Sequence, residues 1–161
     1  YIASILLPAC GSPTATTTPP AAQSPDYSDA APDATPVLST ETEVGVLNVA
    51  VSGTTFSVTL KTTDTGCEHY ADWWEVVTLD GELLYRRILA HSHVDEQPFT
   101  RSGGPVDVAP DQTVRVRLHM NTSGYSLIGM EGSTASGFAV ATFPEEFAPD
   151  VGGLLPDGCA F

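Results

Sequence analysis

The sequence predicts an all-β protein, in which a single antiparallel β-sandwich follows a disordered N-terminal stalk. Three observations support this prediction. Apolar and β-branched residues alternate with polar residues along several short segments. Glycine-rich turn sequences separate these segments. Only two short stretches, residues 68–72 and 145–147, have a pattern that would suit a helical turn. A small β-barrel is the alternative architecture.

We expect about seven strands in an immunoglobulin-like arrangement, and six of them can be placed. The first two are joined at Ser52-Gly53-Thr54, and the next two at Asp80-Gly81, a dipeptide that strongly favours a hairpin. The fifth strand alternates cleanly, because Arg115, Arg117 and His119 share one face and apolar residues share the other. The six segments are 44–51, 55–60, 73–79, 82–91, 113–120 and 137–143.

The N-terminal part contains the motif Leu7-Pro8-Ala9-Cys10-Gly11 at the end of an apolar run. The motif resembles the lipobox of bacterial lipoproteins, with a leucine three residues before the cysteine, a small residue before it and a glycine after it. This resemblance implies that residues 1–9 are the end of a truncated signal peptide and that Cys10 carries the lipid. The alternative is a short apolar start to a soluble chain.

Residues 10–42 consist almost wholly of Pro, Thr, Ala, Ser and Asp. Such a segment cannot bury enough apolar surface to offset the entropy of ordering, so we predict a disordered stalk. Residues 43–161 then form the β-sandwich domain. With a lipidated Cys10, the domain would be extracytoplasmic and anchored to a membrane, either in a periplasm or at the cell surface.

The chain has three cysteines. Lipidation would account for Cys10, which leaves Cys67 and Cys159 to form a disulfide in an oxidising compartment. Their bond would tie the C-terminal end to the central strands. On the chain-entropy account, a loop of that length contributes about 4 to 5 kcal/mol of stability. A thiolate metal site is the weaker alternative, because neither cysteine has a second cysteine close by in the sequence.

The formal net charge is −14, from 20 acidic and six basic residues. This balance argues against nucleic acid as a partner, because nucleic-acid binding needs a positive surface. Five arginines nevertheless fall within one short window. They could form internal salt bridges, or they could hold an anion or a carboxylate. The five are Arg86, Arg87, Arg101, Arg115 and Arg117.

The segment Cys67 to Glu75 combines acidic residues, a histidine and three aromatic residues. Trp73 and Trp74 are adjacent, so on a strand they point to opposite faces. One of them can fill the core, while the other lies on the outer face or under a loop. If that second indole is exposed, it could stack against a sugar or a proline. The alternative is a core tryptophan beside the disulfide.

His91-Ser92-His93 predicts a metal site as an alternative function, because two imidazoles at this spacing on a strand project from one face. Zn or Cu suits such nitrogen ligands. His119 is the candidate third ligand, and further candidates are His69, Asp72, Glu75, Asp95 and Glu96. The competing interpretation is that His91 and His93 lie at a strand end and hydrogen-bond a loop formed by residues 95–104. Bound metal could also activate water for hydrolysis.

The stretches HSHV and EQPFTRSGGP resemble a segment found in exported bacterial proteins without an assigned activity. That resemblance implies that the two histidines, Arg101 and the Gly-Gly-Pro turn form one unit. Together these features favour a lipid-anchored binding or accessory module of the cell envelope over an enzyme. The expected partner is an envelope protein or a glycan, and the expected contact residues are Trp73, Trp74, Arg87 and Arg101.

Overall fold

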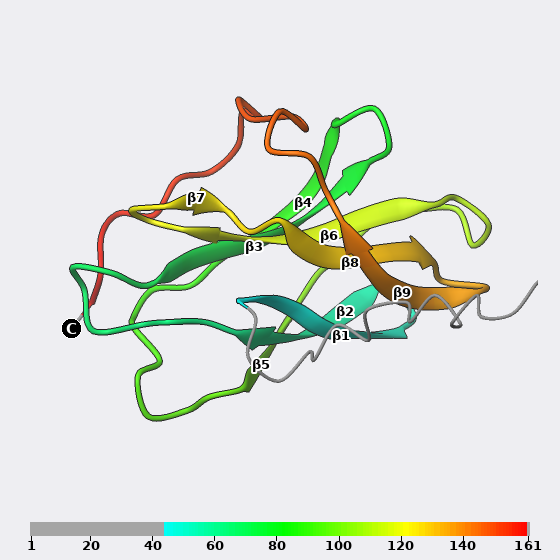
Figure 1. The fold of residues 1–161 in the computed structure, drawn as a ribbon. Helices are drawn as coiled ribbons and strands as arrows, with labels where there is room; N and C mark the ends of the chain where they lie inside the picture. Colours follow the sequence, from blue (N-terminus) through cyan, green and yellow to red (C-terminus); the bar gives the residue numbers. More distant parts are fainter. Residues whose placement is uncertain (1–43, 161) are drawn as a thin grey trace, which may run out of the picture. The chain divides into compact units, whose positions relative to one another are not determined.

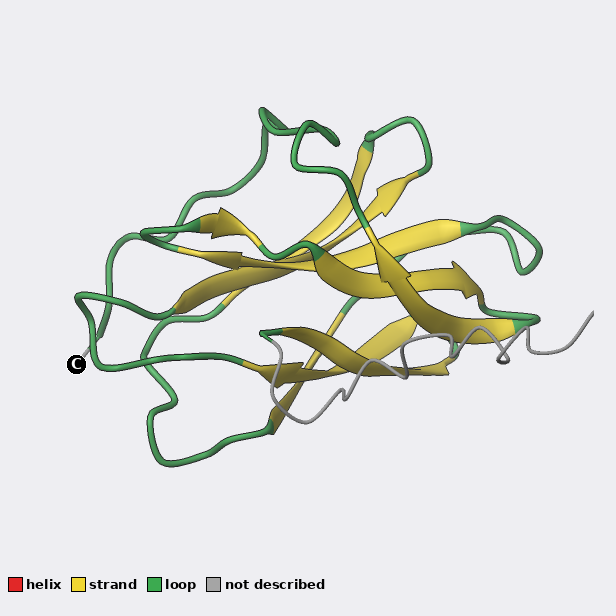
Figure 2. Ribbon diagram, in the orientation of Figure 1, coloured by secondary structure: helices red, strands yellow, loops and turns green. Residues whose placement is uncertain are grey.

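The computed structural model describes residues 44–160. These residues form nine strands. Figure 2 shows strands and loops without a helix among them, so the predicted all-β class is confirmed. Neither of the two stretches whose pattern suits a helical turn is helical: residues 71–72 lie in a strand, and residues 145–146 form a turn. The predicted signal-peptide remnant, Cys10 and the stalk lie outside the described residues. Within the described range, no helix is long and apolar enough to cross a membrane.

The nine strands are connected in the order β4-β3-β6-β8-β1-β2-β5, with β7 paired to β6 and β9 paired to β8. They are β1 (Gly45–Ser52), β2 (Thr55–Lys61), β3 (Ala71–Thr78), β4 (Leu83–Ile88), β5 (Phe99–Gly103), β6 (Val114–Met120), β7 (Gly124–Tyr125), β8 (Ile128–Ser133) and β9 (Gly137–Thr142).

The strands form two layers (Figure 1). The lower layer contains β1, β2 and β5, and the upper layer contains β3, β4, β6 and β8. A single parallel bridge between Gly45 and Ile128 joins the layers on one side. On the other side the terminal strands β4 and β5 contact each other, so the sheet nearly closes. The fold therefore shares features of both architectures expected from the sequence, the sandwich and the barrel.

Both predicted hairpins are present. In the first, Ser52 pairs with Thr55, and in the second, Val77 pairs with Leu83. Gly53 and Gly81 occupy the turns with φ of 59° and 86°, a region of backbone space that favours glycine. The predicted alternation along β6 is also confirmed, because its apolar residues are buried toward the other layer.

The core lies between the two layers. From the lower layer it receives Val46, Phe56, Val58 and Leu60, and from the upper layer Trp74, Val76, Val114, Val116 and Leu118. Each of these side chains is fully buried. Burying a large apolar side chain stabilises a fold by roughly 1.5 to 3 kcal/mol, so this interface is the main source of cohesion. The outer face of the upper layer carries buried charged side chains, among them Glu75, Arg86 and Arg117.

Candidate functional site

The two tryptophans lie on opposite faces of β3, as predicted, but both are buried, which contradicts the alternative of an exposed indole that stacks against a ligand. Trp74 is 0% exposed and packs in the core, whereas Trp73 is 7% exposed on the outer face of β3. The ring of Trp73 is covered by the guanidinium of Arg86, which lies 4.4 Å from the ring centroid. Tyr125 meets the same indole edge-on, with 6.3 Å between ring centroids.

A buried carboxylate lies at the centre of this outer face. Glu75 on β3 faces Arg86 on β4 and Arg117 on β6, because the strand register places all three side by side. Each oxygen of the Glu75 carboxylate accepts a hydrogen bond from one guanidinium Nε, both at 2.8 Å. The two arginine side chains are 2% exposed and that of Glu75 is 0% exposed. Four of the five arginines therefore form salt bridges: those of Arg86 and Arg117 are buried, and those of Arg101 and Arg115 are partly exposed.

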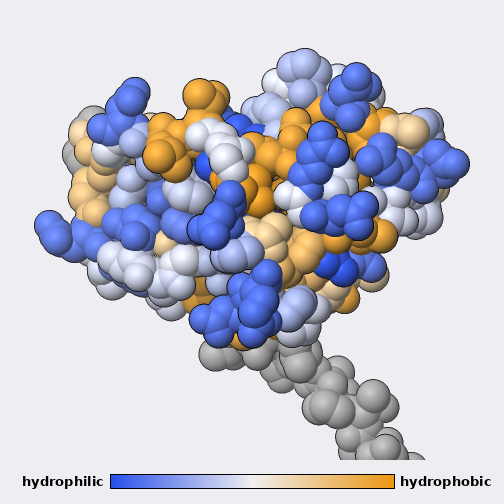
Figure 3. Space-filling view, turned by 90° about the horizontal axis from the view of Figure 1, so that it is seen from above, coloured by the Kyte–Doolittle hydropathy of each residue, from blue (hydrophilic) through white to orange (hydrophobic). Residues whose placement is uncertain are grey.

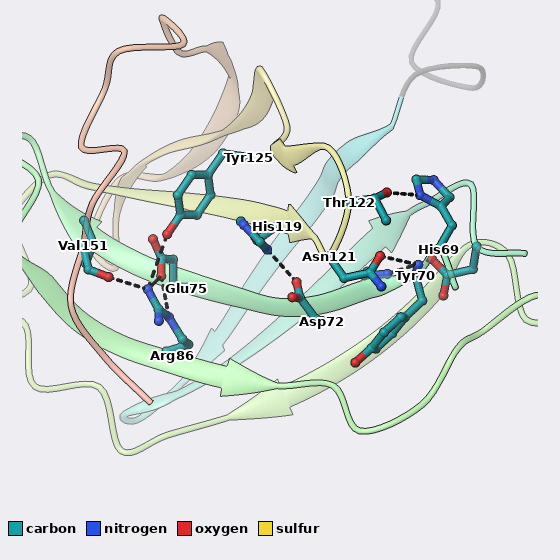
Figure 4. Close-up of polar contacts among 12 residues, drawn as sticks. His69, Tyr70, Asp72, Glu75, Arg86, His119, Asn121, Thr122, Tyr125 and Val151 are labelled. Atoms are coloured by element: carbon teal, nitrogen blue, oxygen red, sulfur yellow. Dashed lines mark hydrogen bonds and ion pairs between the residues drawn. The ribbon is translucent and has the colours of Figure 1, made fainter. Parts of the chain in front are cut away.

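The segment after β9 passes over these arginines, and we name residues 144–160 the C-terminal strap. Arg117 donates to the carbonyls of Phe147 and Ala148 at 2.6 and 2.8 Å. Arg86 donates to the carbonyls of Val151 and Leu154 at 3.0 and 3.1 Å. Figure 4 shows the contact between Arg86 and Val151. The strap carbonyls therefore accept hydrogen bonds from guanidinium N–H groups that the Glu75 carboxylate does not bind.

The predicted disulfide between Cys67 and Cys159 is present and holds the far end of the strap. The backbone N–H of Ala160 also donates to the carbonyl of Ala90. Beside the disulfide, the side chain of Asn121 connects the segment before β3 to the end of β6. It accepts a hydrogen bond from the N–H of Tyr70 (Figure 4) and donates one to the carbonyl of Cys67. Both ends of the strap are thus attached to the upper layer.

His119 on β6 is fixed from two sides. Its Nδ1 lies 2.6 Å from a carboxylate oxygen of Asp72 (Figure 4). Its ring stacks on Trp73 with centroids 3.7 Å apart. The Tyr125 ring meets the imidazole edge-on at 4.8 Å. Burial, followed by the negative charge of Glu75, raises the pKa of Tyr125, so its hydroxyl stays protonated at neutral pH.

Two hollows open on either side of the turn that leads into β7. One, of about 460 Å³, is lined by His119, Ser123, Gly124, Tyr125, Leu127, Glu145 and Pro149. The other, of about 380 Å³, shares Ser123, Gly124, Tyr125 and Leu127 with the first and also includes His69. Figure 3 looks down on this side of the molecule and shows hydrophobic residues interspersed with hydrophilic ones. The hollows combine aromatic, aliphatic and polar groups, which is typical of ligand sites.

A smaller cavity of about 110 Å³ lies after β4, on another part of the surface. Its lining contains four of the residues singled out in the sequence: Arg87, His91, His93 and Arg101. Ile88, Leu89 and Ala90 complete it. His91, His93 and Arg101 thus line one cavity together with Arg87, whereas the Gly-Gly-Pro turn that the resemblance joined to them does not line it.

His93 is the buried member of this group. Its side chain is 1% exposed and stacks on Phe99 with ring centroids 3.9 Å apart. Neither ring nitrogen has a hydrogen-bond partner, and the nearest carboxylate oxygen, on Asp64, lies 3.8 Å from Nδ1. Burial lowers the pKa of His93 below its ordinary value, and the positive charge of Arg101 lowers it further. The imidazole is therefore neutral at neutral pH.

The expected three-histidine metal site is not formed. Among residues 44–160, no group of three or more histidine, cysteine, aspartate or glutamate side chains is placed to hold a metal ion. His91 and His93 are adjacent, with ring centroids 4.5 Å apart. His119 is bound to Asp72 instead, and the ring nitrogens of His69 contact the hydroxyls of Thr63 and Thr122. The four histidines therefore lie in three separate places: His91 with His93, His119 beside Asp72, and His69 between two threonines.

Sequence reasoning did not identify Asp64 or Tyr125. Asp64 is buried and accepts from the backbone N–H groups of Ala71 and His93, so it fixes the loop before the cavity. A single aspartate in a polar segment carries no local signal for such a role. Tyr125 lies on the short strand β7, which was not predicted, and its importance depends on long-range contacts with β3 and β4.

About half of the chain is similar in sequence to a known protein. An 83-residue stretch, 51% of this chain, is 48% identical to a protein of Halomicrobium mukohataei named "Putative lipoprotein". The chain covers 40% of that relative's length. No protein-family model matches the chain. No solved structure matches it either.

Proposed function

We propose that the protein is a lipid-anchored, extracytoplasmic module of the cell envelope that binds its ligand at the two hollows beside β7. Cys10 would carry the anchor and residues 10–42 would form the stalk. Residues 44–160 would then present the hollows to an envelope protein or a glycan. Three kinds of support converge on the anchor: the lipobox-like motif, the name of the relative, and a disulfide typical of an exported domain.

The observation that carries the binding role is the fixed geometry of His119. The imidazole lies between the Trp73 ring and the Asp72 carboxylate, and it lines the larger hollow. A side chain held in one orientation loses little conformational entropy when a ligand binds to it. Leu127, which is 50% exposed, lines both hollows and supplies an apolar contact. Such a mixture suits a sugar or a peptide, which present both apolar and hydrogen-bonding groups.

The anchor is tested by fractionating cells that express the full-length protein. The unaltered protein should sediment with membranes, and Cys10→Ala should leave it in the soluble fraction. Mass spectrometry of the N-terminal peptide should find acyl chains on Cys10 alone. Membrane association that survives Cys10→Ala would contradict the proposed anchor.

The ligand site is tested with oligosaccharides and peptides released from the envelope of the producing organism. Binding should shift the NMR signals of the His119 and Tyr125 rings. Leu127→Asp should abolish binding, because it places a charge between the two hollows. Val140→Asp is the matched control, since Val140 is 44% exposed on β9 and lines neither hollow. Equal loss in both variants would reject the hollows as the site.

A further inference from the structure

The small cavity after β4 concentrates positive charge in a protein whose formal net charge is −14. Arg87 lines it from β4, and its guanidinium makes no hydrogen bond or ion pair with any described residue. Arg101 lines the same cavity from β5, the strand that forms the other end of the sheet. The near closure of the sheet therefore brings the two guanidinium groups to one site.

The interior of the cavity offers a polar group without a partner. His93 lines the cavity, its side chain is 1% exposed, and neither ring nitrogen makes a hydrogen bond. A neutral imidazole always carries one N–H donor. Leaving such a donor buried and unsatisfied is costly, so native structures rarely keep one without a reason. A bound ligand that accepts this hydrogen bond would remove the cost.

Arg101 already contacts a carboxylate of the chain, on a residue that does not line the cavity. Its guanidinium lies 2.6 Å from the carboxylate of Glu96, whose side chain is 59% exposed. The hydrogen bond from Arg101 lowers the pKa of the Glu96 carboxyl, so this carboxylate is charged at neutral pH. Exposed ion pairs of this kind contribute little to stability. A second carboxylate can therefore compete for Arg101 at low cost.

We propose that this cavity binds a small carboxylate, held by the guanidinium groups of Arg87 and Arg101 and by the ring of His93. The planar guanidinium fork matches the two oxygens of a carboxylate. A volume of about 110 Å³ holds roughly three or four water-sized groups, which suits a carboxylate with a short apolar substituent. Ile88 and Leu89 lie where that substituent would contact the wall.

The carboxylate could be a free small acid or the end of a peptide chain, and two probes separate these sources. Acetate stands for the free acid and N-acetylalanine for a peptide terminus. Each is titrated into the full chain at constant ionic strength, with sodium chloride as the balancing salt. The ring signals of His91 and His93 are followed by NMR, and the same titration is done with inorganic phosphate and with Zn²⁺.

We expect saturable shifts with acetate, with half-saturation on the order of 1 to 10 mM, as a ligand of few atoms permits. Arg87→Gln and Arg101→Gln should each weaken binding about five- to tenfold, because each removes a charge-assisted hydrogen bond. Glu96→Gln should strengthen binding, since it removes the competing carboxylate. Arg115→Gln is the matched control, because Arg115 pairs with Glu131 and lies outside the cavity.

N-acetylalanine binding as tightly as acetate identifies a peptide terminus as a permitted ligand, and much weaker binding restricts the site to free acids. The proposal is overturned if acetate gives no saturable shift, or if Arg87→Gln and Arg115→Gln have equal effects. Saturation by phosphate alone would replace the carboxylate with a larger anion. Saturation by Zn²⁺ alone would make His91 and His93 metal ligands. None of these results depends on the hollows beside β7.

Discussion

The indole of Trp73 and the imidazole of His119 are stacked, with ring planes 6° apart and centroids separated by 3.7 Å. The two residues are direct neighbours in the pairing of β3 with β6. This contact fixes the orientation of a histidine that lines the larger hollow. It also explains why Trp73 is buried although it lies on the outer face.

Replacing His119 with alanine should destabilise the fold by about 1 to 3 kcal/mol. The change removes the stacking interaction and leaves the Asp72 carboxylate, whose side chain is 5% exposed, without its imidazole partner. Urea unfolding measures the loss. The double variant Asp72→Asn/His119→Ala should lose less than the sum of the single changes, because the two residues interact directly. Strict additivity would show that the contact contributes nothing.

Replacing Glu75 with glutamine should be far more damaging. It leaves the guanidinium groups of Arg86 and Arg117 buried against each other without a counter-charge, which typically costs about 3 to 5 kcal/mol. The comparison variant is Glu131→Gln, which breaks the partly exposed pair with Arg115 and should cost less than about 1 kcal/mol. Similar unfolding midpoints for the two variants would contradict the central role of Glu75.

Removing the disulfide with Cys67→Ser/Cys159→Ser should lower the free energy of unfolding by about 2 to 5 kcal/mol. The bond closes a loop across 92 positions of sequence and anchors the end of the C-terminal strap. Amide hydrogen exchange should show faster exchange at Ala160, whose N–H donates to Ala90. Unchanged exchange there would mean that the hydrogen bonds from Arg86 and Arg117 hold the strap without the disulfide.

Stability should also depend on the protonation of His93. Burial lowers the pKa of this imidazole below 6.5, so the unfolded chain takes up a proton at a higher pH than the folded chain does. The charged or titratable groups that act on it are Arg101, His91, Asp64 and Glu96. Stability conferred by the neutral ring is therefore complete above about pH 6.5 and falls as the pH decreases below that value.

The variant His93→Phe separates this contribution from those of the acidic residues. Phenylalanine keeps a ring to stack on Phe99 and has no nitrogen to leave unsatisfied, so stability at pH 7 should be maintained or rise by about 1 kcal/mol. Between pH 7 and pH 5, the variant should lose less stability than the unaltered protein. Parallel curves for the two proteins would show that His93 does not titrate in this range.

The sequence was informative where the structure depends on local patterning. The alternation along β6 predicts which side chains enter the core, because neighbours on a strand face opposite sides. The hairpins follow from Gly53 and Gly81, whose backbone angles suit tight turns. In the candidate sites, the grouping of His91, His93 and Arg101 was implied only by the resemblance of their segment to exported bacterial proteins, and the three residues line one cavity.

What the sequence did not predict depends on contacts between distant segments. Strand β8 contains two glycines, Gly129 and Gly132. Glycine is depleted in strands, so the sequence of β8 does not indicate a strand. Both glycines are required by close packing, since a Cβ at Gly129 would lie 2.4 Å from the Phe143 ring. Strand β5 was expected to be a loop, because its Thr-Arg-Ser-Gly sequence has no alternating apolar face. It forms by pairing with the edge of β2.

Arg86 and Arg117 hydrogen-bond the C-terminal strap through its backbone carbonyls, and the ring of Phe147 is the strap side chain that also contacts the arginines. Every amino acid has such a carbonyl, so the strap can change much of its sequence and still be held in place. We therefore expect Glu75, Arg86 and Arg117 to persist among homologues in which the residues around Val151 differ. Amino-acid substitutions in the strap would change the shape of the larger hollow, because Glu145 and Pro149 line it. The folded domain would remain intact. Homologues could acquire different ligands in this way without losing stability.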